Sequence, residues 1–344
     1  MHSYNQNSKM RIPFHIVLLP TGSIGHFVQD YEKVLFEIDR IRQRERFVVF
    51  FLRGSEVCNL YFLRQLTTRH RFLPRIPFIH LHRVCLRLSK TYRQRDQQID
   101  SKSDSVLKNI HTTPIPFLVT ERDKAVDDAI DRILRTFGMT KYVCLVARDL
   151  GFDRKLSRDD IELQKQAMRI TPINSFLPTI KFLNQLGFLV IRLGRHNDSR
   201  LESDCSKLAF VEIEDIESKF DDIADFQVIE KSTFLISTGS GIDCVGLFYR
   251  KPVLYVNLLS ASAHPETPLC PVGLLPYYYD CRREIRLTFD EVTADPISSA
   301  GTSKLRELGI SIIPKGPAEI LNAVEIFVAF LQQNYDYRKK LLLY

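Results

Sequence analysis

The 344-residue sequence has no apolar run that approaches the roughly 18 residues needed to cross a bilayer. Its first ten residues are polar and no apolar core precedes Arg11, so we expect neither a membrane span nor a secretion signal. The seven cysteines are scattered, and no two of them have the Cys-x-x-Cys spacing of zinc or redox sites. We therefore expect reduced thiols in a cytoplasmic protein.

The composition is that of a globular protein, with 44% hydrophobic and 26% charged residues. The length favours two domains of ordinary size, each with room for a buried core. The net charge of +7 favours an acidic partner, such as nucleotide phosphates, nucleic acid or an anionic membrane surface.

The most informative stretch is residues 230–257, which contains strand, turn, helix and strand signals in that order. Residues 233–236 are β-branched or aromatic and predict a buried strand. The small residues 237–241 follow as a turn in which glycine permits positive φ. Apolar residues then recur at helical spacing until Lys251-Pro252, and residues 253–256 form a second strand. This order predicts a parallel α/β domain.

The turn Ser237-Thr238-Gly239-Ser240-Gly241 suits a phosphate, because free N–H groups and a helix dipole are favourable to anions there. The hydroxyl groups of its serines and threonine add donors without bulk. No lysine follows Gly241, so a P-loop ATPase is disfavoured. A tight turn that binds nothing fits the same residues equally well.

The N-terminal part shows the same succession of signals. Residues 14–19 predict a strand, a glycine turn leads to His26, apolar residues from Phe27 repeat with helical period, and residues 47–52 predict another strand. Two such units suggest two Rossmann-like domains that face each other. A histidine directly after the turn is a candidate general base, and the alternative is a histidine that caps the turn or points to solvent.

Two further strands end in arginine. Residues 142–147 deliver Arg148-Asp149, and residues 188–191 deliver Arg192. Ligands of open α/β sheets bind at the carboxyl edge of the strands, where a planar guanidinium can hold a diphosphate. The alternative for Arg148 is an ion pair with Asp149 that closes the strand end.

Residues 61–95 carry many arginines with interleaved aromatic residues and no acid. Such a stretch suits nucleic acid, anionic lipid or a negatively charged acceptor, and a solvated basic face is the alternative. Residues 258–276 are rich in proline and predict a loop. Residues 277–280 (Tyr-Tyr-Tyr-Asp) are predicted to belong to the same loop.

Several short motifs resemble a family of glycosyltransferases from bacterial surface-polysaccharide loci. They are Ile24-Gly25-His26, Val146-Ala147-Arg148-Asp149, a segment from Arg169 to Gly194, the block from Phe234 to Asn257, and Leu308-Gly309-Ile310 with Pro317-Ala318-Glu319-Ile320. The chain departs from that family at Val146, where a histidine is common.

The resemblance implies an α/β fold with two Rossmann-like domains facing each other across a cleft, which is the GT-B arrangement. Residues 1–140 would be the acceptor domain, 141–325 the nucleotide-sugar domain and 326–344 a C-terminal helix. No Asp-x-Asp motif lies at a strand end, in keeping with a metal-independent enzyme that needs no cofactor. Backbone N–H groups and arginine would then stabilise the leaving diphosphate.

The predicted roles follow from these motifs. His26, or Asp30 one helical turn later, would deprotonate the acceptor hydroxyl. The predicted donor site consists of Arg148, Arg192, Ser237, Thr238, Gly239, Ser240, Gly241 and Asn257.

The predicted function is transfer of a sugar from a nucleotide sugar to a surface polysaccharide or another glycan, including a lipid-linked one. The expected location is cytoplasmic, with peripheral contact at the inner face of the membrane. A nucleotide-sugar epimerase of the same fold and a non-catalytic nucleotide- or glycan-binding protein are the alternatives. A nucleic-acid-binding protein is disfavoured because no nucleic-acid motif is present.

Overall fold

The structure is a computed structural model of the whole chain, and residues 14–20, 22–41, 47–53, 57–69, 110–112, 122–155, 163, 166–202, 207–216 and 221–333 are described. The chain divides into two compact units, Met1–Ser101 and Lys102–Tyr344. This division lies earlier than the boundary predicted near residue 140. The helix over 124–137, which we placed in the first domain, belongs to the second unit.

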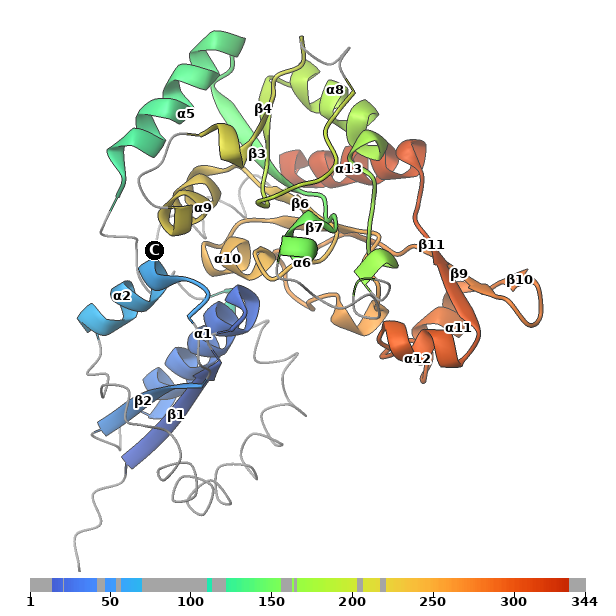
Figure 1. Cartoon of the computed structure of the whole chain (residues 1–344), viewed down its shortest axis with the longest axis horizontal. Helices are drawn as coiled ribbons and strands as arrows, with labels where there is room; N and C mark the ends of the chain where they lie inside the picture. The colour runs from blue at the N-terminus through green and yellow to red at the C-terminus, as the bar shows by residue number, and fades with distance from the viewer. Residues whose placement is uncertain are drawn as a thin grey trace, which may run out of the picture. The chain divides into compact units, whose positions relative to one another are not determined.

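The first unit confirms the predicted succession of strand, helix and strand (Figure 1). Strands β1 and β2 pair in parallel, from Phe14 opposite Phe47 to Pro20 opposite Arg53. A helix connects the two strands, as a parallel crossover requires. The described elements of this unit are β1 (Phe14–Pro20), α1 (Ile24–Ile41), β2 (Phe47–Arg53) and α2 (Leu60–Arg69).

Aromatic side chains hold α1 and α2 together within this unit. The ring of Phe62 lies 5.0 Å from that of Phe27 and 5.7 Å from that of Tyr31, in both cases edge-on. All three residues are buried. Asn59 caps α2 by accepting the N–H of Phe62 at 2.7 Å, which satisfies one of the donors left over at a helix start.

The second unit is built on a six-stranded parallel sheet in the order β5-β4-β3-β6-β7-β8. Counted from β3, this order reads 3-2-1-4-5-6, which is that of the Rossmann fold, and it confirms the predicted α/β class. The order reverses between β3 and β6, and that point is the topological switch of the sheet. The strands are β3 (Lys141–Val146), β4 (Phe188–Arg192), β5 (Phe210–Glu212), β6 (Leu235–Ser237), β7 (Val253–Val256) and β8 (Gly273–Leu274).

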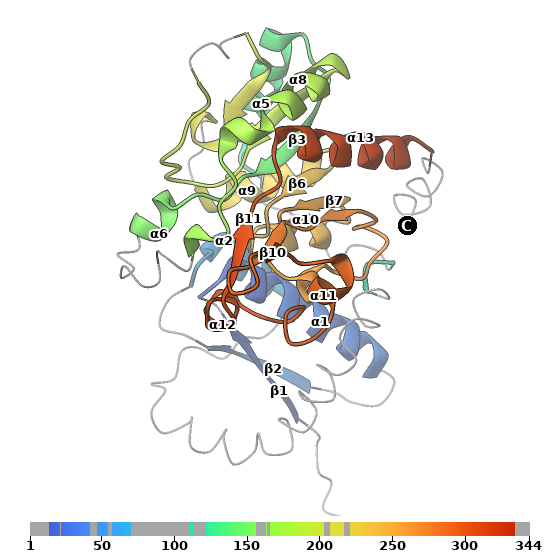
Figure 2. The same ribbon diagram turned by 90° about the vertical axis from the view of Figure 1, so that its right-hand side faces the viewer.

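Helices cover both faces of this sheet, in agreement with its buried strands (Figures 1 and 2). On one face lie η1 (Ile173–Phe176), α8 (Leu177–Gln185) and α13 (Pro317–Gln333). The other face carries α10 (Asp243–Phe248) and α9 (Asp221–Lys231), with α5 (Lys124–Phe137) packed against α9. Short elements complete this part: α6 (Gly151–Lys155), η3 (Ile213–Asp215) and η4 (Ala261–Ala263).

Alternation along β3 divides its side chains between the two layers. Val143 and Leu145 belong to the core beneath α8 and α13. Tyr142 points to the opposite layer, where its hydroxyl donates to the carbonyl of Val228 in α9 at 2.8 Å. This period of two is expected of a strand that is buried on both faces.

A small antiparallel sheet follows the main one, with β9 (Tyr277–Asp280) between β10 (Ile285–Arg286) and β11 (Ile310–Ile313). The prediction that residues 277–280 lie in a loop is wrong, because they form the central strand. The side chain of Tyr278 is buried in a local core, whereas Tyr277 lies between Lys315 and Arg286, each about 3 Å from its ring. Helices α11 (Phe289–Thr293) and α12 (Thr302–Glu307) accompany this sheet.

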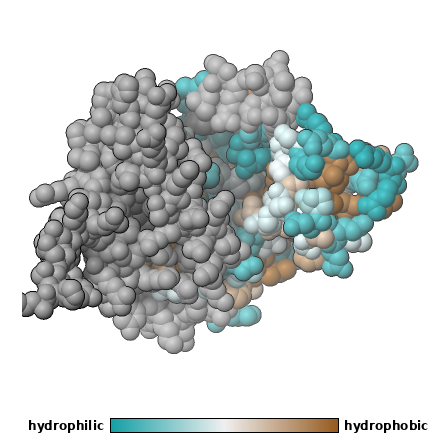
Figure 3. Space-filling view, turned by 90° about the horizontal axis from the view of Figure 1, so that it is seen from below, coloured by the Kyte–Doolittle hydropathy of each residue, from teal (hydrophilic) through white to brown (hydrophobic). Residues whose placement is uncertain are grey.

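The described surface carries scattered apolar side chains. Phe289 is 72% exposed, and Ile285 and Ile313 are also exposed. Figure 3 shows hydrophobic patches that hydrophilic residues interrupt. In the described residues, no helix combines the length and the apolar character that a membrane span requires.

We expect Phe327→Ala to lower the free energy of unfolding by about 3–5 kcal/mol, because truncation leaves a cavity in the core of the second unit. The Phe327 side chain is fully buried, and its ring lies 5.4 Å from that of Phe234. Phe330→Ala on the same helix is the matched control, since Phe330 is 38% exposed and should lose about 1 kcal/mol or less. Equal losses in urea unfolding would contradict this packing.

Candidate functional site

The carboxyl ends of β3 and β6 lie side by side at the topological switch. The N–H of Thr238 donates to the carbonyl of Val146 at 3.0 Å, and the N–H of Arg148 donates to the Thr238 hydroxyl at 3.0 Å. These bonds bring Arg148 next to the turn 237–241. Two groups that are about 90 residues apart in sequence therefore share one edge of the sheet, at the place where such folds bind ligands.

Much of the turn is bonded within itself. The N–H of Gly239 donates to the Ser237 hydroxyl at 3.0 Å, and this hydroxyl donates to the Asp243 carboxylate at 2.6 Å. The N–H of Ser240 donates to the other oxygen of Asp243 at 2.7 Å. The Thr238 hydroxyl donates to the carbonyl of Val146.

These bonds change the predicted phosphate cradle. Ser237 and Thr238 are buried, and their hydroxyl groups serve the turn itself. The N–H groups of Gly239 and Ser240 already have protein acceptors. Moreover α10 has six residues, so its dipole contributes little to an anion site. Of the predicted turn donors, the Ser240 hydroxyl and the Gly241 N–H remain as candidates for a ligand.

Gly239 is required by the geometry of the turn. Its φ is +85°, a value that residues with a side chain rarely adopt. A Cβ atom there would also lie 2.8 Å from Leu258 Cδ1. The small-residue pattern in the sequence thus reflects backbone conformation and close packing.

A second arginine, which the sequence analysis did not assign to the site, lies at the turn. Arg169 Nη2 donates to the carbonyl of Gly239 at 2.9 Å. Arg169 Nη1 and Arg148 Nη2 approach the same oxygen of Gln166, at 3.4 and 2.7 Å. Two half-buried guanidinium groups therefore converge beside the turn. The available signal was the position of Arg169, which opens one of the segments that carry the family resemblance.

Asp243, which was not among the predicted site residues, is 2% exposed and lies at this turn. Burial raises the pKa of its carboxyl to about 6, although hydrogen bonds from Ser237 and Ser240 and the charges of Arg169 and Arg148 act in the opposite direction. The sequence signal that could have identified Asp243 is its spacing from Ser240. This is the spacing of a capping box, in which an acidic side chain accepts the N–H of a residue three positions earlier.

Arg192, predicted as a clamp for the diphosphate, is fully buried. Its guanidinium donates to the carbonyl of Ser199 at 2.7 Å and pairs with Glu212 at 3.2 Å and Asp149 at 3.5 Å. Burial alone would raise the pKa of Asp149, but hydrogen bonds from the N–H groups of Ser199 and Gly151 hold this pKa below its ordinary value. Because both Nη atoms donate to acceptors inside the protein, we remove Arg192 from the candidate donor site.

Asn257 likewise has a structural position. Its backbone has a φ of 54°, and its side chain accepts the N–H of Lys315 at 2.7 Å and donates to Thr171 at 3.1 Å. The residue is buried and ties the end of β7 to the segment before α13. We therefore remove Asn257 from the candidate donor site as well.

The two predicted base residues belong to the first unit. His26 is the third residue of α1 and is exposed, and Asp30 follows one helical turn later and is partly buried. Residues four apart lie on the same face of a helix. The basic stretch 61–95 starts within α2, but its residues after 69 lie outside the described part of the chain.

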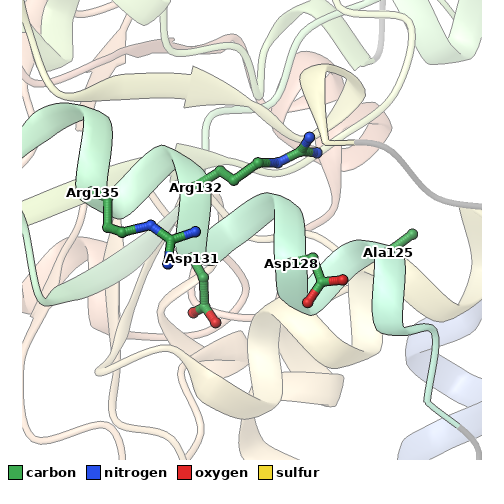
Figure 4. Close-up of a pocket in the computed structure, with 5 residues that line it drawn as sticks. All are labelled: Ala125, Asp128, Asp131, Arg132 and Arg135. Carbon is green, nitrogen blue, oxygen red and sulfur yellow. The ribbon is translucent and has the colours of Figure 1, made fainter.

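Among the residues that the structure describes, those that line a surface pocket all belong to α5 (Figure 4). None of the predicted site residues borders it. In the described part of the chain, no three His, Cys, Asp or Glu side chains are grouped as a metal site. The lining residues are Ala125, Asp128, Asp131, Arg132 and Arg135.

No family profile and no curated protein matches the chain. Among solved structures, ADP-heptose LPS heptosyltransferase II of E. coli is similar at 12% identity and a TM-score of 0.42, covering 86% of this chain and 98% of that one. A glycosyl transferase family 9 protein of Veillonella parvula is similar at 10% identity and a TM-score of 0.45, covering 91% and 96%.

A third similar structure is S. aureus MnaA with UDP, at 12% identity and a TM-score of 0.28, covering 71% of this chain and 79% of that one. All three TM-scores are low, so we assign neither fold nor function from these similarities.

We expect Arg192→Ala to lower the free energy of unfolding by about 3–5 kcal/mol, because it removes the fully buried cation that pairs with the carboxylates of Glu212 and Asp149. Arg200→Ala is the matched control, since Arg200 also pairs with Glu212, at 3.6 Å, but is 54% exposed. It should cost about 1 kcal/mol or less. Similar losses for both variants in urea unfolding would contradict a structural role for Arg192.

Proposed function

We propose that the protein is a glycosyltransferase that takes a sugar from a nucleotide-sugar donor to a glycan acceptor. The observation that supports this proposal most directly is the pair Arg148 and Arg169 beside the turn 237–241, at the topological switch of a Rossmann-type sheet. Open α/β sheets bind nucleotides at this point. The family resemblance of the motifs around these residues supports sugar transfer as the reaction.

The two arginines suit the diphosphate of a nucleotide sugar. A guanidinium group presents paired N–H donors that match phosphate oxygens, and two of them carry the charge needed opposite a diphosphate. We assign the Ser240 hydroxyl and the Gly241 N–H as further donors of the turn. When the sugar leaves, negative charge increases on the diphosphate, and fixed cations at that place stabilise the transition state without a metal.

We assign the role of base to His26, with Asp30 as the alternative. The base takes the proton of an acceptor hydroxyl, and the hydroxyl oxygen forms a bond to the anomeric carbon of the sugar. The bond between this carbon and the diphosphate breaks, and a nucleoside diphosphate leaves. A surface polysaccharide or lipid-linked glycan as acceptor, and a cytoplasmic location with peripheral membrane contact, remain predictions from the sequence.

The donor site is tested by thermal unfolding with UDP, GDP, ADP, dTDP and CMP. A ligand that binds only the folded protein, at 100 times its Kd, adds about 2.7 kcal/mol, which raises the Tm by several degrees. We expect one diphosphate to act selectively. We also expect Arg148→Ala and Arg169→Ala each to weaken its binding by about tenfold or more, because a charged hydrogen bond to phosphate is lost.

Arg306→Ala is the matched control for these variants, because Arg306 is an exposed arginine on α12. It should bind the nucleotide like the wild type. Unchanged affinity in both Arg148→Ala and Arg169→Ala would remove the donor site from this edge of the sheet. If no nucleotide raises the Tm at several concentrations, the proposed function is refuted.

We expect His26→Ala to slow sugar transfer by about 10²–10⁴-fold, because general base catalysis contributes an effect of this size. Nucleotide affinity should stay nearly intact, since the proposed partner of His26 is the acceptor hydroxyl and not the nucleotide. Release of nucleoside diphosphate in the presence of acceptor measures the rate. Loss of transfer in Asp30→Asn with normal rates in His26→Ala would assign the base to Asp30 instead.

A further inference from the structure

Asp243 places a buried negative charge inside the proposed anion site. Its carboxylate accepts the Ser237 hydroxyl at 2.6 Å and the N–H of Ser240 at 2.7 Å, and the residue is 2% exposed. The sugar-transfer mechanism above does not use this group. Burying an ionised carboxylate is costly. A negative charge beside a phosphate site also weakens the binding of an anion there.

The net charge of the groups near the turn determines how strongly an anionic ligand is attracted there. The side chains of Arg148 and Arg169 bring two positive charges, and both stabilise the Asp243 carboxylate electrostatically. With Asp243 ionised, these three groups sum to +1, and with Asp243 protonated they sum to +2. A bound diphosphate adds negative charge next to the carboxylate and engages the same two arginines. Its presence therefore favours the neutral carboxyl.

We propose that Asp243 takes up a proton when the phosphates of the ligand bind at this turn, so that anion affinity increases as the pH falls. Asp243 is a positioning residue here, because it acts through Ser240 and the two arginines and does not touch the ligand. The inference rests on the donor site of the proposed function, but it does not depend on sugar transfer.

Protonation also changes the turn itself. Hydrogen bonds to a carboxylate are roughly twice as strong as those to a neutral acceptor. The neutral carboxyl therefore holds the Ser240 N–H less firmly, and this N–H becomes more available to a phosphate oxygen. Charge and hydrogen bonding thus act in the same direction.

The pH range of the effect follows from the burial of Asp243, which raises its pKa to about 6 in the absence of ligand. A bound anion raises it further, so the ligand-bound protein takes up a proton in the range above about pH 6. Affinity should increase from about pH 8 to about pH 5, one unit below the pKa of the free protein, and level off below that. A ratio of about tenfold between the low-pH and high-pH affinity limits corresponds to a rise of one in the pKa on binding.

Other titratable groups interact with Asp243 and could in principle contribute to the proton uptake. Tyr255 on β7 and Cys270 in the following loop interact with it electrostatically, and burial raises the pKa of both above their ordinary values. Neither ionises in the pH range of the test. The thiol of Cys244 directly follows Asp243 in α10, and Arg148 and Arg169 act on the Asp243 carboxylate electrostatically.

The test measures proton uptake by titration calorimetry in buffers of different ionisation heat. The probe is UDP-glucose, ADP-glucose, GDP-mannose or dTDP-glucose, whichever carries the base selected in the thermal unfolding panel. Both phosphates of these compounds are esterified, whereas a terminal phosphate has a pKa near 6 of its own and would obscure the result. We expect the wild type to take up a fraction of a proton near pH 7, and Asp243→Asn to take up none and to show a flat pH profile.

Glu212→Gln is the matched control, because burial also raises the pKa of Glu212 but its carboxylate pairs with Arg192. This variant should keep the proton uptake of the wild type. If Asp243→Asn does not fold, Ser237→Ala replaces it. It removes one hydrogen bond that stabilises the carboxylate, and it should move the proton uptake to higher pH.

The outcomes separate this inference from the proposed function. Binding of the nucleotide sugar by the wild type without proton uptake overturns the inference and leaves the donor site intact. Proton uptake that persists in Asp243→Asn assigns it to another group and also overturns the inference. If none of the nucleotides or nucleotide sugars binds, the donor site and this inference are both refuted.

Discussion

The hydrogen bonds of Thr238 are the interaction on which the candidate site depends. Through its N–H and its hydroxyl, this residue connects the turn after β6 to the carbonyl of Val146 and the N–H of Arg148 at the end of β3. The Rossmann strand order makes these two strands neighbours. The sheet topology provides the edge, and Thr238 sets the backbone of Arg148 against the turn.

Burial divides the arginines of this edge into two kinds. Arg192 is fully buried, and its two Nη atoms contact Ser199, Glu212 and Asp149, so it stabilises the ends of the strands. Arg148 and Arg169 are half-buried beside the turn. A buried ion pair is costly to break and serves structure, whereas a partly exposed guanidinium can exchange its contacts for those of a ligand.

The turn itself is more self-contained than a phosphate-binding loop. The carboxylate of Asp243 takes the N–H of Ser240 and the hydroxyl of Ser237, which are donors that a phosphate would otherwise use. The protein thus carries an internal anion at the place where an external one is proposed to bind. We infer that pH and ligand both change the charge of the turn, since the Asp243 carboxylate and the proposed ligand interact with the same two arginines.

The sequence by itself determined the local elements, because alternation, helical period and glycine turns act over short distances. It predicted β1-α1-β2, the strands that end at Arg148 and Arg192, and the turn with its glycine at positive φ. It did not reveal which arginine is buried, since burial of Arg192 depends on Glu212 and Ser199 from other segments. Nor did it reveal that Asp243 and Arg169 meet at the turn, or that residues 277–280 pair as a central strand. Those facts depend on contacts between distant parts of the chain, which only the tertiary structure decided.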